Sequence, residues 1–231
     1  MKTILFNVEM TMAILEGRKV QTRRVIKSVK DAGVEFKRFE LKGNSFNGFW
    51  RDEDRAKKFS QPLRDFVKQE AKYQKDETIW VREPAKIEDF SGGKIWYRYK
   101  ADNERGIIPF PCRLYVERTK GFKVDYPMWL INKKGVPNGC IKEMARIFLK
   151  VTDVRVERLQ DISAEDIRKE GVVVPYEPME FSDGGQKYYG NKHTVFSAWI
   201  KLWNSTAPKG YKWEDNPYVF VYEFERVENN A

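Results

Sequence analysis

Apolar and polar side chains alternate most regularly in the second half of the chain. Between residues 145 and 159, Ile147, Leu149 and Val151 alternate with polar residues, which predicts a half-buried strand. The phase of the alternation changes at Thr152, which indicates a bulge or a bend. Runs rich in aromatic and β-branched residues predict further strands at residues 3–6, 78–82, 94–99 and 218–227.

Short stretches of helical periodicity separate these strands. Met10, Ala13 and Ile14 share one face of a predicted helix, and Gly17 is the residue type that ends helices. Ser163 has a side chain that is preferred at a helix N-cap. Further helices are predicted at residues 60–73, 164–170 and 195–203.

Two long stretches show neither the alternation of a strand nor the periodicity of a helix. Residues 29–59 are polar, basic and interrupted by glycines, which predicts an irregular insertion. Prolines and glycines recur in residues 105–138, which predicts surface loops. Short strands and short helices with no βαβ repeat predict an α+β fold, a mostly antiparallel β-barrel with helices at its ends.

Composition narrows the class of protein. The chain has 231 residues, of which 41% are hydrophobic and 14% aromatic, too many for a disordered protein. No apolar run approaches the roughly 20 residues of a membrane helix, and polar residues interrupt the first 15 residues where a signal peptide would be apolar. Two cysteines and one histidine argue against a disulfide framework and a tetrahedral zinc site. We therefore expect a cytoplasmic protein with no membrane partner, no metal and no cofactor.

The formal net charge of +9 is distributed unevenly. Residues 1–120 hold 27 Lys and Arg against 18 Asp and Glu, whereas the remainder holds 16 of each. Such a one-sided surplus fits a polyanion such as nucleic acid, and it equally fits a solvated, lysine-rich surface. Trp80 and Trp96 fall in predicted strands and are expected in the core, so Trp50 is the better candidate for stacking on a base.

Five blocks follow one another along the chain: GRKVQTRR at residues 17–24, TIWVRE at 78–83, ARIFLKVT at 145–152, LQDIS at 159–163 with EG at 170–171, and NPYVFVYEF at 216–224. In this order they resemble the ASCH domain family, whose members are PUA-like β-barrels. The sequence is most similar to the long ASCH proteins of bacteriophages and prophages. That resemblance implies a single domain with insertions at about residues 29–74 and 84–142, located in the cytoplasm of a bacterial cell or a phage-infected host.

The resemblance also implies a site for RNA or a modified nucleoside, or for DNA, in a basic cleft. One compact branch is similar to N4-acetylcytidine amidohydrolase, and its catalytic lysine, threonine and glutamate match Lys19, Thr22 and Glu170. Other members bind RNA or cleave it. The family therefore leaves three functions open: an amidohydrolase, a non-catalytic RNA- or DNA-binding module, and a metal-independent ribonuclease.

Amide hydrolysis would give each of these residues a separate role. Thr22 would attack the acyl carbonyl, Lys19 would act as its base when neutral, and Glu170 would protonate the departing amine. Residues three apart in an extended segment point to opposite faces, so this interpretation requires a turn or bulge between Lys19 and Thr22. A Lys-x-x-Thr pair in a basic loop also arises by chance, and Glu170 at a helix end is commonly a surface charge.

Further residues are candidates for binding the substrate or nucleic acid. They are Arg18, Arg23, Arg24, Arg82, Glu83 and Trp50. Arg24 could contact a phosphate or a base edge, or it could brace Glu170. Arg82 and Glu83 follow a strand and could orient Lys19, although a structural ion pair with neighbouring residues is the commoner role.

Overall fold

The computed structural model describes most of the chain, as two compact units. The described residues are 1–31, 34–52, 55–109, 113–117, 121–125, 140–176, 178–183, 186–191 and 193–228. Unit 1 comprises Met1–Glu16, Thr78–Lys150 and Arg226–Ala231, and unit 2 comprises Gly17–Glu77 and Val151–Glu225. The fold is α+β, with most elements being strands in several small sheets and few helices.

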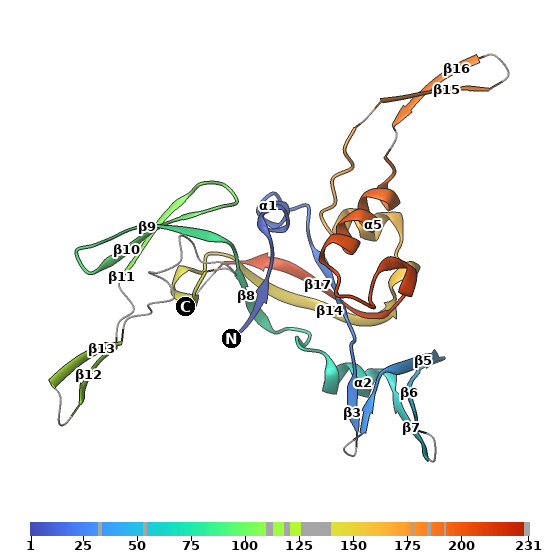
Figure 1. The fold of residues 1–231 in the computed structure, drawn as a ribbon, viewed down its shortest axis with the longest axis horizontal. Coiled ribbons are helices and arrows are strands. Elements are labelled where there is room, and N and C mark those ends of the chain that lie inside the picture. The colour runs from blue at the N-terminus through green and yellow to red at the C-terminus, as the bar shows by residue number, and fades with distance from the viewer. Residues whose placement is uncertain are drawn as a thin grey trace. The chain divides into compact units, whose positions relative to one another are not determined.

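A five-stranded sheet has the order β1-β8-β14-β17-β2. Its strands are β1 (Lys2–Leu5), β8 (Thr78–Arg82), β14 (Phe148–Arg158), β17 (Tyr218–Val227) and β2 (Gln21–Val25). β1 pairs with β8 in parallel, whereas the β8–β14 and β17–β2 pairs are antiparallel. Figure 1 shows β14 and β17 side by side. The predicted strands near residues 78, 145 and 218 thus share one sheet. In the described pairings β1 and β2 are its edges, so closure into a barrel stays a prediction.

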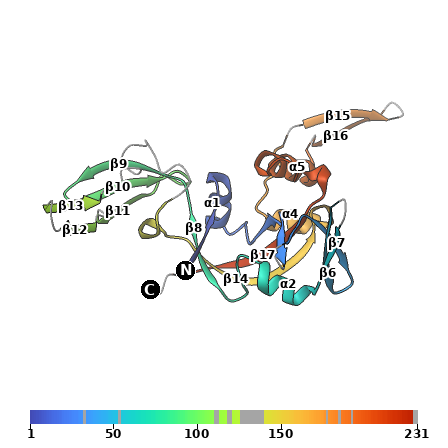
Figure 2. The same cartoon turned by 60° about the horizontal axis from the view of Figure 1, so that its bottom comes forward.

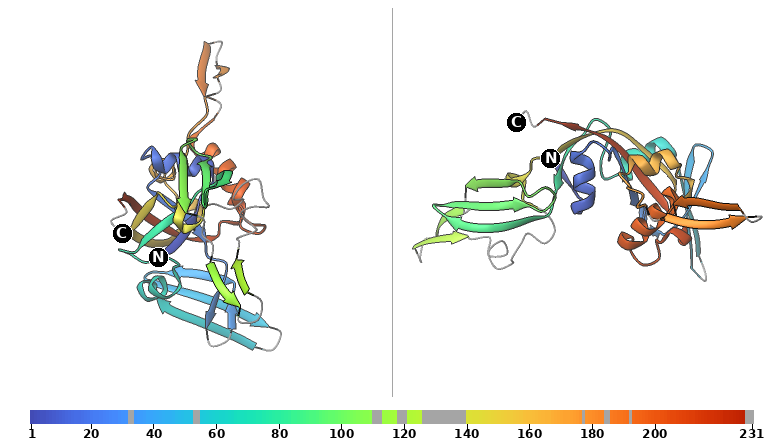
Figure 3. Two further views of the ribbon diagram at one scale, coloured as in Figure 1. Left: turned by 90° about the vertical axis from the view of Figure 1, so that its left-hand side faces the viewer. Right: turned by 90° about the horizontal axis from the view of Figure 1, so that it is seen from above.

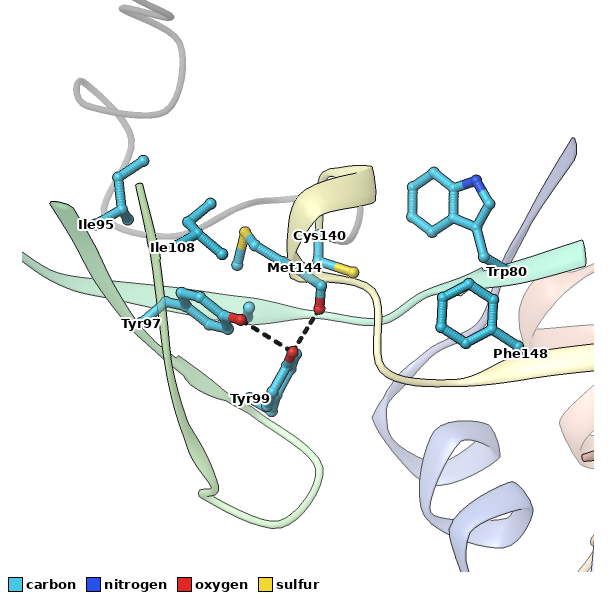
Figure 4. Close-up of a cluster of buried hydrophobic side chains, with 9 residues drawn as sticks. Trp80, Ile95, Tyr97, Tyr99, Ile108, Cys140, Met144 and Phe148 are labelled. Atoms are coloured by element: carbon cyan, nitrogen blue, oxygen red, sulfur yellow. Dashed lines mark hydrogen bonds between the residues drawn. The ribbon is translucent and has the colours of Figure 1, made fainter. Parts of the chain in front are cut away.

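Unit 1 has its core under a three-stranded sheet of order β11-β10-β9. These strands, β9 (Ala85–Ser91), β10 (Lys94–Tyr99) and β11 (Arg105–Pro109), lie together in Figure 3. Tyr97 and Tyr99 point toward Met144 of the 3-10 helix Lys142–Met144, and Cys140 lies beside it (Figure 4). Unit 1 also contains α1 (Val8–Leu15) and the hairpin of β12 (Arg113–Glu117) and β13 (Gly121–Asp125).

Unit 2 contains two small sheets near α2 (Leu63–Glu70), and Figure 2 shows α2 beside β6 and β7. The strands are β3 (Val29–Asp31), β4 (Val34–Phe36), β5 (Arg38–Lys42), β6 (Ser45–Asp52) and β7 (Arg55–Pro62). Phe46 and Phe66 are fully buried, with ring centroids 4.1 Å apart, and so join α2 to β6. Unit 2 also holds α4 (Ala164–Lys169), α5 (Val195–Thr206), and the hairpin of β15 (Pro178–Asp183) and β16 (Gln186–Asn191).

Some sequence predictions were wrong. Residues 29–59 are not irregular, because they form β3 to β7, whose few buried phenylalanines are too widely spaced to show a period. The described part of residues 105–138 contains strands rather than loops alone. Ser60 does not cap a helix; it pairs with Asn47 in the sheet, and α2 begins at Leu63. Trp96 is 38% exposed and not in the core, whereas Trp80 is buried as predicted.

Within the described residues, no helix is both long enough and apolar enough to cross a membrane.

Candidate functional site

A cluster of buried polar side chains lies in unit 2 where β2 begins. It consists of Lys19, Gln21, Thr22, Arg23 and Glu170, which we call the Lys19 cluster. Each of these residues is at most 3% exposed. Burying so many polar groups is costly unless each is hydrogen-bonded or paired, so the contacts within the cluster decide its chemistry.

Helix α4 positions Glu170. The Ser163 side chain accepts a hydrogen bond from the Asp166 amide and begins the helix, and Glu170 is its C-cap. Gly171 follows with φ +80°, a conformation that costs glycine little. This end of the helix meets the chain before β2, since Lys19 and Glu170 form an isolated antiparallel bridge and the Val20 amide donates to the Lys169 carbonyl. Two segments far apart in the sequence are thereby held together through their backbones.

The Lys19 ammonium is surrounded by oxygen acceptors. Its Nζ lies 2.8 Å from Oε2 of Glu170, 2.9 Å from the Glu170 carbonyl oxygen and 2.8 Å from the Gln21 carbonyl oxygen. The Lys19 side chain is 1% exposed. Loss of hydration lowers the pKa of Lys19 below its ordinary value, and the negative charge of Glu170 opposes that change.

Arg23 binds the other oxygen of Glu170. Its Nη1 lies 3.0 Å from Glu170 Oε1, and its Nη2 also pairs with Glu157 and lies 3.5 Å from Asp166 Oδ2. Its side chain is 0% exposed. The predicted role of Arg23 in contacting a polyanion therefore does not fit its position, because its guanidinium is enclosed among carboxylates and fixes Glu170.

Thr22 lies on the opposite face of β2 from Arg23, together with Arg24, because neighbouring residues of a strand alternate. Arg24 Nη1 donates to Thr22 Oγ1 at 2.9 Å and to the Arg23 carbonyl oxygen at 3.0 Å. Thr22 is opposite Tyr222 of β17. The Tyr222 hydroxyl accepts from the Lys72 amide at 3.1 Å, and burial raises the pKa of Tyr222 to about 12. Arg24 is the partly exposed member of this group.

The structure shows no turn or bulge between Lys19 and Thr22, which the hydrolase interpretation requires. Lys19 lies in the isolated bridge with Glu170, and β2 begins two residues later at Gln21, so Lys19 is not part of the alternation of β2. Arg24 is near enough to Glu170 and Lys19 for their charges to interact. The three predicted catalytic residues therefore lie in one neighbourhood of unit 2, and two of them are in direct contact.

The other predicted residues are placed differently. Arg18 is exposed and its Nη1 donates to the Gly171 carbonyl oxygen at 2.9 Å. Arg82 and Glu83 belong to unit 1, where Glu83 forms two 2.8 Å hydrogen bonds with Arg146. Glu83 thus has the structural ion pair that was the alternative interpretation. Trp50 lies in β6, and its side chain is outside the described residues.

The sequence did not point to several residues that surround Arg23 and Thr22. Glu157, Asp166 and Tyr222 contact Arg23 or Thr22 through the sheet and α4. From the sequence, Asp166 is recognisable only as a residue in the first turn of a helix. Glu157 is recognisable only as a polar position of a strand. In the described part of the chain, no group of three His, Cys, Asp or Glu side chains is placed to hold a metal ion.

Comparison with family models, with curated proteins and with solved structures finds no match to this chain.

Proposed function

We propose that unit 2 carries the site of an ASCH-type protein that recognises RNA or a modified nucleoside and hydrolyses an amide of the N4-acylcytidine kind. The observation that carries the proposal is the 2.8 Å contact between Lys19 Nζ and Glu170 Oε2, with Thr22 three residues from Lys19 and bound to Arg24. The shared sheet of β8, β14 and β17 supports a PUA-like barrel with insertions at residues 29–74 and 84–142 as its fold.

The Lys19–Glu170 pair supplies both proton-transfer groups. Moving one proton across this hydrogen bond converts ammonium and carboxylate into a neutral amine and a carboxylic acid. Burial of the Lys19 side chain, which is 1% exposed, lowers the pKa of Lys19 and so favours its neutral amine relative to water. The neutral amine is the form that acts as a base, and the carboxylic acid is the form that acts as an acid.

The reaction then proceeds with all atoms accounted for. Thr22 Oγ1 bonds to the acyl carbon while its proton passes to Lys19, and the carbonyl becomes an oxyanion. Glu170 gives its proton to the exocyclic nitrogen, the carbon–nitrogen bond breaks, and the nucleoside leaves with a free amine. Water then hydrolyses the Thr22 ester, which releases the carboxylic acid and restores the hydroxyl. Arg24, bound to Thr22 Oγ1 at 2.9 Å, orients that oxygen.

A second candidate is a nucleic-acid-binding module without catalysis. The near-complete burial of the Lys19 cluster favours it, because Lys19, Thr22 and Glu170 are only 2–3% exposed. In that function the cluster fixes the start of β2, and the exposed Arg18 with the net charge of +9 provides the phosphate contacts.

One substrate panel separates these functions from each other and from a ribonuclease. The purified chain is incubated with N4-acetylcytidine, with cytidine as the matched product, and with single-stranded RNA. Free cytidine from the acylated nucleoside supports the amidohydrolase. Shortened strands support a ribonuclease, and salt-dependent RNA binding with neither product supports the binding module.

A further inference from the structure

The outer face of the β9–β11 sheet carries an exposed tryptophan. In β10 the side chains alternate, so that Ile95, Tyr97 and Tyr99 are buried in the core of unit 1. Trp96 is on the other face and is 38% exposed. Its cross-strand neighbour in β11 is Ile107, which is 46% exposed. The two form an apolar pair on an otherwise polar surface.

Positive charges surround this pair. Lys94 and Arg98 share the face of Trp96 because they lie two residues from it, and Arg105 is opposite Arg98 in β11. Lys86 is opposite Arg98 in β9. The Arg105 side chain is 69% exposed, and Lys86 and Lys94 are exposed as well.

Two acidic residues accompany these four cations. Glu88 binds Arg98 Nε at 2.7 Å and Arg105 Nε at 3.2 Å, and Asp89 is opposite Trp96. The face therefore keeps a positive balance, and Glu88 holds the two arginines on either side of one carboxylate. An exposed indole on a sheet can stack on a nucleic-acid base. Cations beside it can bind the phosphates of the same strand.

We propose that this face of unit 1 binds single-stranded nucleic acid, with Trp96 stacking on a base and Lys94, Arg105 and Lys86 contacting phosphates. A duplex does not fit this chemistry, because its bases are stacked on each other and not available to an indole on a flat sheet. The surface belongs to unit 1 alone, so the proposal is independent of whether Thr22 hydrolyses an amide.

The test is fluorescence anisotropy of a labelled oligouridylate with the full chain. Trp96→Ala should weaken binding by about 5-fold to 150-fold, the range for loss of one base stack, whereas Trp96→Phe should retain most of the affinity. Phe196→Ala is the matched control, since Phe196 is 39% exposed and lies in unit 2. This variant should bind oligouridylate as tightly as the wild type. An abasic oligomer with the same phosphates should bind weakly and be insensitive to Trp96→Ala.

The charge contribution is tested separately. Lys94→Gln and Arg105→Gln should each reduce the slope of log affinity against log salt by about 0.7 per lost phosphate contact. Lys201→Gln, on the exposed side of α5, is the control and should leave the slope unchanged.

The proposal is overturned if Trp96→Ala binds oligouridylate like the wild type, if it weakens the abasic oligomer equally, or if duplex RNA binds as tightly as the single strand. Circular dichroism of each variant shows whether the fold is kept. If the alanine variant unfolds, the affinities of the wild-type chain for the intact and the abasic oligomer still test stacking, and equal affinities overturn the proposal. Release of cytidine from N4-acetylcytidine is measured separately, so failure of the hydrolase proposal is distinguished from failure of this one.

Discussion

Lys19 Nζ lies 2.8 Å from Glu170 Oε2, although 151 positions separate the two residues in the sequence. The backbone bridge between the same two residues places them there, and Arg23 binds the second carboxylate oxygen. Glu170, itself 3% exposed, thus accepts from two cations in a site almost closed to solvent. This arrangement has consequences for stability as well as for catalysis.

Removing Lys19 should destabilise the fold. Loss of one member of a buried ion pair costs about 3–5 kcal/mol, and we expect Lys19→Met near the lower end because Arg23 still binds Glu170. The measurement is the free energy of unfolding in urea. Lys169→Met is the control, since its pair with Glu165 is 41% and 75% exposed, and its loss should lower the free energy of unfolding much less than the loss of Lys19 does. Equal losses in the two variants would contradict a buried pair.

Stability should depend on pH through Lys19. Because the pKa of Lys19 is lowered by burial, the unfolded chain binds this proton more strongly than the folded one. The free energy of unfolding should therefore rise with pH below the ordinary value of 10.5, and the contribution should be lost as pH falls through the lowered pKa. Lys19→Met should flatten this slope in urea titrations at a series of pH values. If the slope is unchanged in Lys19→Met, the pH dependence of stability arises from other groups.

Tyr222 should govern alkaline stability. Burial raises its pKa from 10.0 to about 12, so the folded state keeps a proton that the unfolded state releases in that interval. Its contribution is complete below pH 10.0 and lost as the pH rises through about 12. Tyr222→Phe should remove this loss, measured by urea unfolding and by phenolate absorbance. Tyr176→Phe is the control, because Tyr176 is 76% exposed, and an equal effect there would refute the assignment.

Two glutamates that bind the same arginine should differ in how much each stabilises the fold. Glu83 is 0% exposed in its side chain and binds Arg146 bidentately, whereas Glu104, also bound to Arg146, is 64% exposed. We expect Glu83→Gln to reduce the free energy of unfolding by about 3 kcal/mol and Glu104→Gln by less than about 1 kcal/mol. Thermal and urea unfolding check the difference. Similar small effects would show that Arg146 is held mainly by its stacking on Tyr99, 3.7 Å from the ring centroid.

Local signals predicted the regular elements of the fold. The run from Tyr218 to Val227 forms β17, and Ser163 and Gly171 delimit α4 because capping depends on the nearest few residues. The sheets within residues 29–62 were not predictable in this way. Their cores use isolated phenylalanines, such as Phe46, that pack against α2 and leave most positions polar.

The candidate site was predictable only where a family resemblance named its residues. Lys19 and Glu170 come together through a bridge between distant segments, which periodicity does not encode. Trp96 shows the converse case: a strand position with a large aromatic suggested the core, yet the strand buries the alternate residues Ile95 and Tyr97 instead. The choice of face depends on the partner of the sheet, and not on the strand itself.

The most direct test of the account is the release of cytidine from N4-acetylcytidine by the wild-type chain and by Thr22→Ala. Lys19→Met and the double variant are measured beside them. If Thr22, Lys19 and Glu170 act as one unit, each single change should abolish most turnover and the double variant should be little worse than either, with RNA affinity retained. Full turnover by Thr22→Ala would contradict the central claim.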